Sequence, residues 1–207
     1  MAAPGGLLMA KLMMPETSAA AERFDPAETG EDERAVNVFE AIGNGAATGL
    51  TLALNVGAML LAFVAMIALF NGMLGGIGGW FGFEELTLQF LLGKLFAPIA
   101  YLLGVPWDEA NIAGSLIGQK MVINEFYAYA NFVLLKETLS AQTQVIITFA
   151  LCGFANLASI AILLGGLGSI VPSRRRDIAR FGLRAVIGGT LANLMSASLA
   201  GLFYSLQ

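Results

Sequence analysis

Residues Leu50–Phe70 read LTLALNVGAMLLAFVAMIALF, and this stretch decides the fold class of the chain. As a helix rising 1.5 Å per residue it would extend about 30 Å, the thickness of the hydrocarbon core of a bilayer. It lies in an uncharged run, Ala41–Phe83, and two further runs without Asp, Glu, Lys or Arg cover Thr138–Ser173 and Ala185–Gln207. Each run exceeds the roughly 20 residues that cross a bilayer. The sequence therefore predicts an all-α integral membrane protein.

The composition of the 207-residue chain excludes several classes of function. Only 13% of the residues are charged and the mean hydropathy is +0.75, whereas soluble domains carry about 25% charged residues. No histidine is present, which excludes His-dependent triads, imidazole acid–base catalysis and His-ligated metals. A single cysteine, Cys152, permits neither an internal disulfide nor a thiolate cluster, and its apolar surroundings predict burial. With a net charge of −4 as well, we expect no enzyme, no cofactor, no bound metal and no nucleic-acid partner.

The first part of the chain predicts one short and one complete membrane segment. Residues 1–14 are apolar apart from Lys11 and reach only about 21 Å as a helix, so we expect the end of a truncated membrane helix, with a short amphipathic anchor as the alternative. Residues 15–46 are acidic and predict an aqueous linker with a short surface helix. A complete transmembrane helix is expected over 47–72, where the glycines that begin at Gly72 would end it.

In the middle of the chain, charged residues separate apolar stretches that are too short to cross a membrane. Residues 84–104 predict an interfacial helix. Residues 105–136 hold two short apolar segments around the polar cluster Gln119–Glu125, a pattern that favours a re-entrant hairpin. Irregular backbone at membrane depth requires protein or a water-filled cavity around it, so a hairpin with a polar tip implies a cavity.

The last part of the chain predicts two membrane helices and a basic loop between them. Residues 143–171 carry CGFANLAS, Cys152–Ser159, near the centre, which is typical of a broken transporter helix and equally compatible with a helix packed through small residues. The arginine-rich loop 172–182 predicts a cytoplasmic location by the positive-inside rule, and lipid-headgroup binding is compatible with it. Residues 183–206 predict the last transmembrane helix.

Glu125 is the main candidate for chemistry. A carboxylate at membrane depth is costly unless it is solvated, paired or hydrogen-bonded. We expect it to accept hydrogen bonds from a hydroxyl-bearing solute, because its two oxygens can hold vicinal hydroxyls. Lys120, five residues earlier, offers an alternative in which the two charges form a purely structural pair.

Four further residues are candidates for the same site. Asn124 would add an amide donor and acceptor beside Glu125. If the segment is helical, Asn156 and Ser159 lie on one face and would complete a polar site. Phe154 would supply an apolar wall, although plain packing is the alternative for a single phenylalanine.

The pattern around this cluster resembles the signature of the concentrative nucleoside transporter family. The resemblance is specific because an Asn–Glu–Phe triplet stands in a longer motif with a lysine, and it extends over essentially the whole chain. Tyr127 departs from the family, which usually has valine there. The segments that carry the resemblance are Gly118-x-Lys120-x-x-x-Asn124-Glu125-Phe126-x-Ala128-Tyr129, Gly153-Phe154-Ala155-Asn156 with Ser159, Gly104-Val105-Pro106-Trp107, and Leu52–Val56 with Ala58–Leu60.

This resemblance implies a secondary transporter that takes up nucleosides with a sodium or proton gradient and forms homotrimers in the inner (plasma) membrane. It implies that the chain is the C-terminal half of an inverted-repeat fold, with 47–72 as a scaffold helix. The residues matching Glu125, Asn156 and Ser159 would contact ribose hydroxyls, and Phe154 would line the site. The nucleobase and sodium contacts would lie mainly in the other half. A truncated membrane subunit without independent activity is the alternative.

Overall fold

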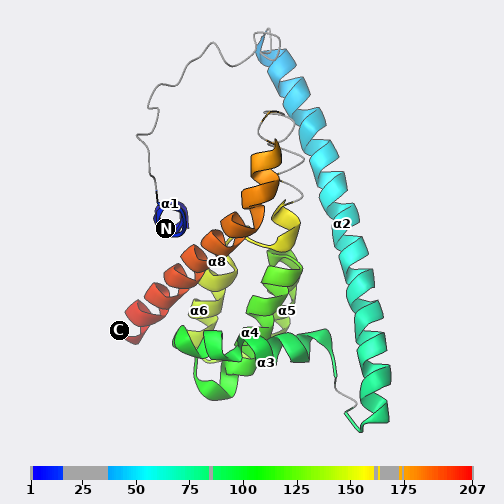
Figure 1. Ribbon diagram of the computed structural model, residues 1–207, viewed down its shortest axis with the longest axis vertical. Helices are drawn as coiled ribbons and strands as arrows, with labels where there is room; N and C mark the ends of the chain where they lie inside the picture. Colours follow the sequence, from blue (N-terminus) through cyan, green and yellow to red (C-terminus); the bar gives the residue numbers. More distant parts are fainter. Residues whose placement is uncertain are drawn as a thin grey trace. The chain divides into compact units, whose positions relative to one another are not determined.

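The computed structural model describes residues 2–15, 37–83, 86–160, 163, 173 and 175–206, and the regular elements within these ranges are helices (Figure 1). The chain divides into two compact units, one comprising Glu16–Gly72 and the other Met1–Pro15 with Met73–Gln207. The elements are α1 Ala2–Met13, α2 Val38–Trp80, α3 Leu88–Leu102, α4 Trp107–Val122, α5 Glu125–Leu135, the 3₁₀-helix η3 Lys136–Thr138, α6 Ala141–Leu151 and α8 Arg175–Ser205.

Helix α2 is longer than the transmembrane segment expected over 47–72. It continues for 43 residues from Val38 to Trp80, so the glycines from Gly72 onward lie inside the helix. Each glycine disfavours a helix by about 1 kcal/mol relative to alanine. An interruption in an apolar segment would also leave backbone groups unsatisfied, which costs several kcal/mol per group in lipid. Most of the linker expected over 15–46 lies outside the described residues.

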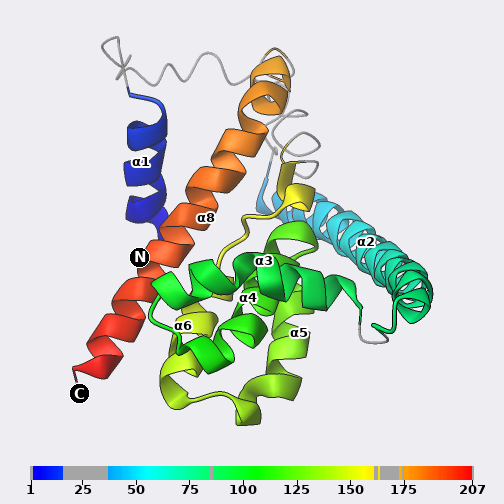
Figure 2. The ribbon, with the colours of Figure 1, turned by 60° about the horizontal axis from the view of Figure 1, so that its bottom comes forward.

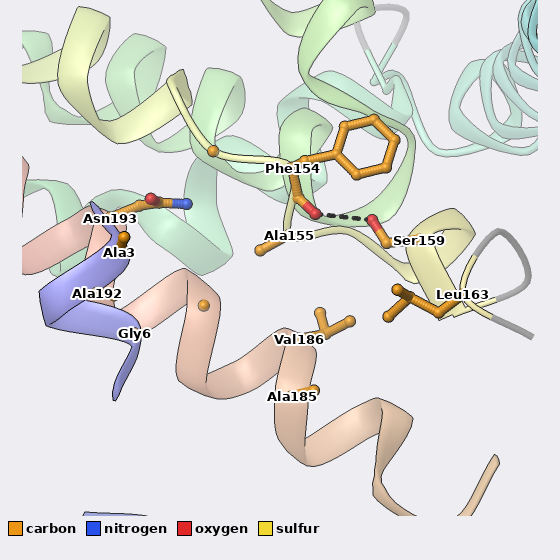
Figure 3. A pocket seen from close by; sticks show the side chains of 12 residues that line it. Ala3, Gly6, Phe154, Ala155, Ser159, Leu163, Ala185, Val186, Ala192 and Asn193 are labelled. Atoms are coloured by element: carbon orange, nitrogen blue, oxygen red, sulfur yellow. Dashed lines mark hydrogen bonds between the residues drawn. The ribbon is translucent and has the colours of Figure 1, made fainter. Parts of the chain in front are cut away.

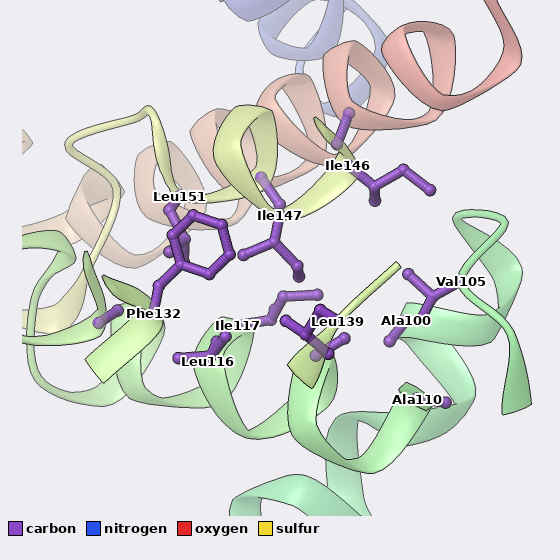
Figure 4. Packing of buried hydrophobic residues seen from close by; sticks show 14 of the residues in the cluster. Ala100, Val105, Ala110, Leu116, Ile117, Phe132, Leu139, Ile146, Ile147 and Leu151 are labelled. Atoms are coloured by element: carbon purple, nitrogen blue, oxygen red, sulfur yellow. The ribbon is translucent and has the colours of Figure 1, made fainter. Parts of the chain in front are cut away.

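The core of the larger unit lies between α3, α4, α5 and α6, and α8 contributes Ala197 to it (Figure 4). Because lipid is as apolar as these side chains, close packing rather than removal from water holds such a core together within a membrane. The fully or nearly fully buried members shown in Figure 4 are Ala100, Val105, Ala110, Leu116, Ile117, Phe132, Leu139, Ile146, Ile147 and Leu151.

Helices α3 and α4 form a bent pair with an angle of 115° and approach each other through glycines. A Cβ on Gly114 would lie 2.5 Å from the Ala97 backbone nitrogen, and a Cβ on Gly118 would lie 2.8 Å from the Leu92 side chain. Small residues four positions apart on one helix face let two helices pack closely. The glycines therefore fix α4 directly against the α3 backbone.

Helices α4 and α5 form a hairpin whose tip consists of only Ile123 and Asn124. Along the hairpin, the Asn131 amide donates to Gln119 Oε1 at 2.7 Å, and Gln119 Nε2 donates to Ser115 Oγ at 2.9 Å. The first of these hydrogen bonds joins the two arms near the tip, and the second, within α4, holds the Gln119 amide in place.

The base of the hairpin is bonded to the start of α6. The Ser140 backbone N–H donates to Glu109 Oε1, and the Ser140 hydroxyl donates to Glu109 Oε2, both at 2.9 Å. Ser140 is the N-cap of α6 and its hydroxyl oxygen accepts from the Thr143 N–H. The carboxylate of Glu109 therefore lies at the positive end of α6, where the helix dipole stabilises an anion.

Helix α6 ends at Leu151, and helical backbone resumes at Leu157. The interruption lies within the segment 143–171 in which the sequence placed a broken helix, and most of the remainder of that segment lies outside the described residues. The expected burial of Cys152 is wrong, because the thiol is exposed. It stands at the first position after α6, where the packed helix stops and its neighbours no longer cover the side chain.

Helix α8 contains 31 residues and begins within the segment predicted as a basic loop, 172–182. It is long and apolar enough to cross a membrane by itself, and the α3–α4 pair would be a further span if counted as one. Helix α1 lies alongside α8 (Figure 2). A Cβ on Gly5 would lie 3.1 Å from the Met195 methyl carbon, so the contact between α1 and α8 is close.

Candidate functional site

The structure joins two of the predicted site residues from separate elements. Glu125 is the first residue of α5, at the hairpin tip, and Asn156 lies in the interruption after α6. Asn156 Nδ2 donates to Glu125 Oε2 at 2.8 Å, across 31 positions of sequence. Asn156 is 1% exposed, whereas Glu125 is only partly buried. An amide that donates to a carboxylate makes a charge-assisted hydrogen bond, which is stronger than a neutral one.

Asn156 and Ser159 also cap the helix that starts at Leu157. Asn156 Oδ1 accepts from the Ser159 backbone N–H at 2.9 Å, and the Asn156 backbone N–H donates to Ser159 Oγ at 3.3 Å. The Ser159 hydroxyl lies 2.9 Å from the Phe154 carbonyl oxygen and 3.0 Å from Asn156 Oδ1, either of which can accept its proton. Both side chains are buried. The sequence predicted that these two residues lie on one face of a helix, whereas the structure places Asn156 just before the helix, where it caps it together with Ser159.

Asn124 occupies the N-cap of α5. Its Oδ1 accepts from the Tyr127 backbone N–H at 2.8 Å, so the amide hydrogens on Nδ2 are the groups left for another partner. Tyr127, the residue that departs from the family pattern, accepts at its hydroxyl oxygen from Gln89 Nε2 at 3.0 Å. This bond between α5 and α3 was not predicted, because it depends on two helices that are distant in sequence.

Lys120 lies in the last turn of α4 and is 1% exposed. Its ammonium interacts electrostatically with the Glu125 carboxylate. The hydrogen-bond donor that the structure places on Glu125 is nevertheless the Asn156 amide rather than the lysine.

A cavity of about 330 Å³ lies beside the interrupted helix (Figure 3). Phe154 and Ser159 line it, and Phe154 is 60% exposed, as an apolar wall would be. Asn124, Glu125 and Asn156 are not among its lining residues, so the cavity does not surround the hairpin tip as the sequence implied. The remaining lining residues are Ala3, Gly6, Gly153, Ala155, Leu163, Ala185, Val186, Gly189, Ala192 and Asn193.

Asn193 is a polar lining residue that sequence reasoning did not assign to the site. It is 4% exposed, belongs to α8, and stands so close to Gly153 that a Cβ on Gly153 would overlap its amide group. The small residues and the asparagine of the last helix are the available signal in the sequence, but such residues on a membrane helix more often indicate close helix packing.

Residues 1–201 match the family described as "Na+ dependent nucleoside transporter C-terminus". The chain belongs to this family. The Na+-dependent nucleoside transporters are not enzymes, in agreement with the composition, and the resemblance drawn from the Asn124–Glu125–Phe126 motif is confirmed.

Relatives in this family are similar over the whole chain. The transporter YutK of Bacillus subtilis is 58% identical over 203 residues, which cover 98% of this chain and 50% of the relative. Nucleoside permease NupC of Helicobacter pylori is 53% identical over 212 residues, which cover 100% of this chain and 50% of the relative. The chain thus spans half the length of these curated relatives.

Solved structures of CNTnw have the same fold as this chain. CNTnw in an inward-facing substrate-bound state is 56% identical with a TM-score of 0.88, covering 99% of this chain and 48% of CNTnw. A variant of CNTnw in an outward-facing state gives a TM-score of 0.90 at 56% identity, covering 99% and 49%. The predicted all-α membrane fold with a re-entrant hairpin and a broken helix is therefore confirmed.

Proposed function

We propose that this chain supplies the ribose-binding half of a cation-coupled nucleoside symporter. The observation that carries the proposal is the 2.8 Å hydrogen bond from Asn156 Nδ2 to Glu125 Oε2, which joins the hairpin tip to the interrupted helix. Both residues belong to the set expected to hold ribose. The name of NupC supports a nucleoside as the solute, because that relative is a nucleoside permease.

Glu125 has the capacity to bind a diol. A carboxylate offers about four lone-pair positions, and Asn156 occupies one of them. The remaining positions can accept hydrogen bonds from the two neighbouring hydroxyls of a ribose. Asn156 retains a second amide hydrogen for a ribose oxygen, and the exposed ring of Phe154 offers an apolar surface for the solute.

Ser159 would act mainly by holding Asn156. Its hydroxyl and backbone N–H are both bonded to groups within residues 154–159, so a ribose hydroxyl would have to exchange with one of these bonds. Asn124 would contribute an amide donor, because its oxygen is engaged in capping α5.

The complete transporter would use a sodium gradient, with a proton gradient as the alternative, and would act as a homotrimer in the inner (plasma) membrane. Sodium coupling is supported by the family description and by the similarity to mouse sodium/nucleoside cotransporter 1. The two sequences are 35% identical over 219 residues, and this chain covers 34% of the mouse protein. Solute and cation together must favour the state that crosses the membrane more than either does alone.

Uptake by a hybrid transporter tests the proposal. The hybrid consists of the N-terminal half of the Bacillus relative followed by this chain. Glu125→Gln keeps the size of the side chain but loses the charge. Since hydrogen bonds to a charged group contribute about 1.5–3 kcal/mol, we expect the KM for uridine to rise roughly ten- to hundred-fold, with unchanged membrane expression.

Glu137→Gln, an exposed site in η3, is the matched control and should leave the KM unchanged. Nucleosides that lack the 2′- or 3′-hydroxyl should bind more weakly by about 1–3 kcal/mol in the unmodified hybrid. Normal uptake by the Glu125→Gln hybrid at low uridine, or equal affinity for uridine and its deoxy analogues, would contradict ribose recognition by Glu125. Titration calorimetry of the chain alone with uridine shows separately whether this half binds solute without the other.

A further inference from the structure

The first ten residues of α8 carry all of the charged side chains of that helix. Residues 173–184, the basic segment, contain five arginines and one aspartate, a net charge of +4, whereas Ala185–Gln207 contains no charged residue. The basic segment forms the start of α8, the orange end of the helix in Figure 1. Among the described residues, its exposed arginines are Arg175, Arg176, Arg180 and Arg184.

These arginines do not stabilise the helix that carries them. The start of a helix has a positive partial charge, which disfavours cations in the first turns. Arg176, Arg180 and Arg184 also repeat every four residues, so like charges are neighbours on one face of the helix and repel each other. Asp177, in the first turn, is the single acidic residue of the basic segment. The arrangement therefore favours an anionic partner that does not belong to this helix.

Two of the arginines are held beside one aromatic ring. The guanidinium carbon of Arg180 lies 5.5 Å from the centre of the Phe181 ring, and that of Arg184 lies 6.0 Å from it. Gly182 is packed against Ile160, where an added Cβ would lie 2.8 Å from the Ile160 methyl carbon Cγ2. At about 100° per residue, positions 180 and 184 lie on the opposite side of the helix from Gly182. The two guanidinium groups are thus positioned together on the exposed side of α8.

The length of the uncharged part of α8 places these two arginines at the level of lipid headgroups. From Ala185 to Ser205 the helix extends about 31 Å, which matches the hydrocarbon core of about 30 Å. Arg184 then lies at the edge of this core, and Arg180 lies about 6 Å further out, within a headgroup layer of about 5–8 Å on each side. Arg175 and Arg176 lie about 12–14 Å out, beyond that layer.

We propose that Arg180 and Arg184 form a binding site for the headgroup phosphate of an anionic phospholipid. A guanidinium group donates two parallel hydrogen bonds to a phosphate, and weak hydration suits it to the membrane interface. The ring of Phe181 keeps both groups in place and offers an apolar surface to the remainder of the lipid. The lipid would supply the negative charge that the helix lacks. The site is distinct from the one proposed for ribose and does not depend on it.

The test is titration of the purified chain, in a neutral detergent, with phosphatidylglycerol and with phosphatidylcholine of the same acyl chains. Native mass spectrometry measures the lipid-bound fraction. We expect the unmodified chain to bind phosphatidylglycerol more tightly, because phosphatidylcholine carries a phosphate but no net charge. The double variant Arg180→Gln with Arg184→Gln should lose roughly 30-fold in affinity for phosphatidylglycerol, since each arginine near the surface contributes a factor of about five. Its affinity for phosphatidylcholine should stay unchanged.

Arg175→Gln with Arg176→Gln is the matched control, because it removes the same charge from exposed positions beyond the headgroup layer. It should lower the affinity for phosphatidylglycerol by less than about fivefold. Equal affinity of the unmodified chain for the two lipids, or equal losses in the two double variants, would overturn the site. Displacement of phosphatidylglycerol by inorganic phosphate would overturn it as well, because the arginines would then recognise free phosphate rather than a lipid.

Phe181→Leu provides a second measurement should the first double variant fail to fold. It keeps both charges and removes the ring that holds them. Cation–π contacts of exposed arginines have a strength that corresponds to a factor of about two to five. We therefore expect the affinity for phosphatidylglycerol to fall by about that factor, and an unchanged affinity would reject the arrangement of Arg180 and Arg184 around Phe181 as a lipid site.

Discussion

Gly153 provides a direct test of how the interrupted helix contacts α8. The residue follows the end of α6 by two positions, and an added Cβ would overlap the Nδ2, Cγ and Oδ1 atoms of Asn193. Asn193 is 4% exposed, and to make room its amide would have to turn away from Gly153 toward the cavity that it lines. Gly153→Ala should therefore force either the amide or the backbone around residue 153 to shift.

The expected cost follows from the size of the overlap. Adding a methyl group to a closely packed site destabilises a protein by about 1–3 kcal/mol. For a chain of this length each kcal/mol lowers the melting temperature by about 2–4 °C, so the variant should melt roughly 2–12 °C below the unmodified chain. Asn193→Ala removes the overlapping atoms, so the double variant should recover most of the loss, with a coupling energy of about 1–3 kcal/mol.

The assay is thermal unfolding of the purified chain in detergent, for both single variants and the double variant. Gly79→Ala is the matched control, since a Cβ there meets no atom within 4 Å and the change should be neutral or stabilising by up to about 1 kcal/mol. If Gly153→Ala melts with the unmodified chain, or if Asn193→Ala fails to restore the double variant, the close contact between Gly153 and α8 is refuted.

Two further changes test the core and the hairpin base. Ile147→Ala truncates a fully buried side chain and should lower the free energy of unfolding by about 2–5 kcal/mol in the same melting assay. Val133→Ala, at a site 68% exposed, is the control and should change the free energy of unfolding by less than about 0.5 kcal/mol. Equal effects of the two variants would contradict the assigned core. Glu109→Gln removes the charge that accepts from Ser140 at two positions and, because the pair is solvent-exposed, should cost under about 1 kcal/mol. Asp108→Asn on the same turn serves as its control, and a melting temperature for Glu109→Gln no lower than that of Asp108→Asn would argue against the contact.

The elements that depend on local composition were the most predictable from sequence. Apolar segments too short to cross a membrane, on either side of Gln119–Glu125, indicated a hairpin, and the structure places a two-residue tip at Ile123 and Asn124. The glycine, asparagine and serine of Cys152–Ser159 indicated an interruption, and α6 ends at Leu151. In both cases the residues that shape the backbone are neighbours in the chain.

The contacts between distant helices were less predictable. The approach of Asn193 to Gly153 depends on how α8 crosses the interruption, and the bond from Gln89 to Tyr127 depends on how α3 meets α5. Neither crossing leaves a periodic pattern in the sequence. The sequence did not predict the reciprocal capping of Asn156 and Ser159 for another reason. The expectation was that both residues contact solute from one helix face, whereas asparagine at the start of a helix is a common N-cap.

The two bonds that connect the hairpin to the following segment span equal lengths of chain. Ser140 follows Glu109 by 31 positions, and Asn156 follows Glu125 by 31 positions. Inserting or deleting one residue within η3 would change the length of both closed segments at once, because each of them contains η3. Both bonds would then be strained or lost together. The length of this connection should consequently tolerate no insertion or deletion, even though η3 itself is exposed and buries none of its three residues.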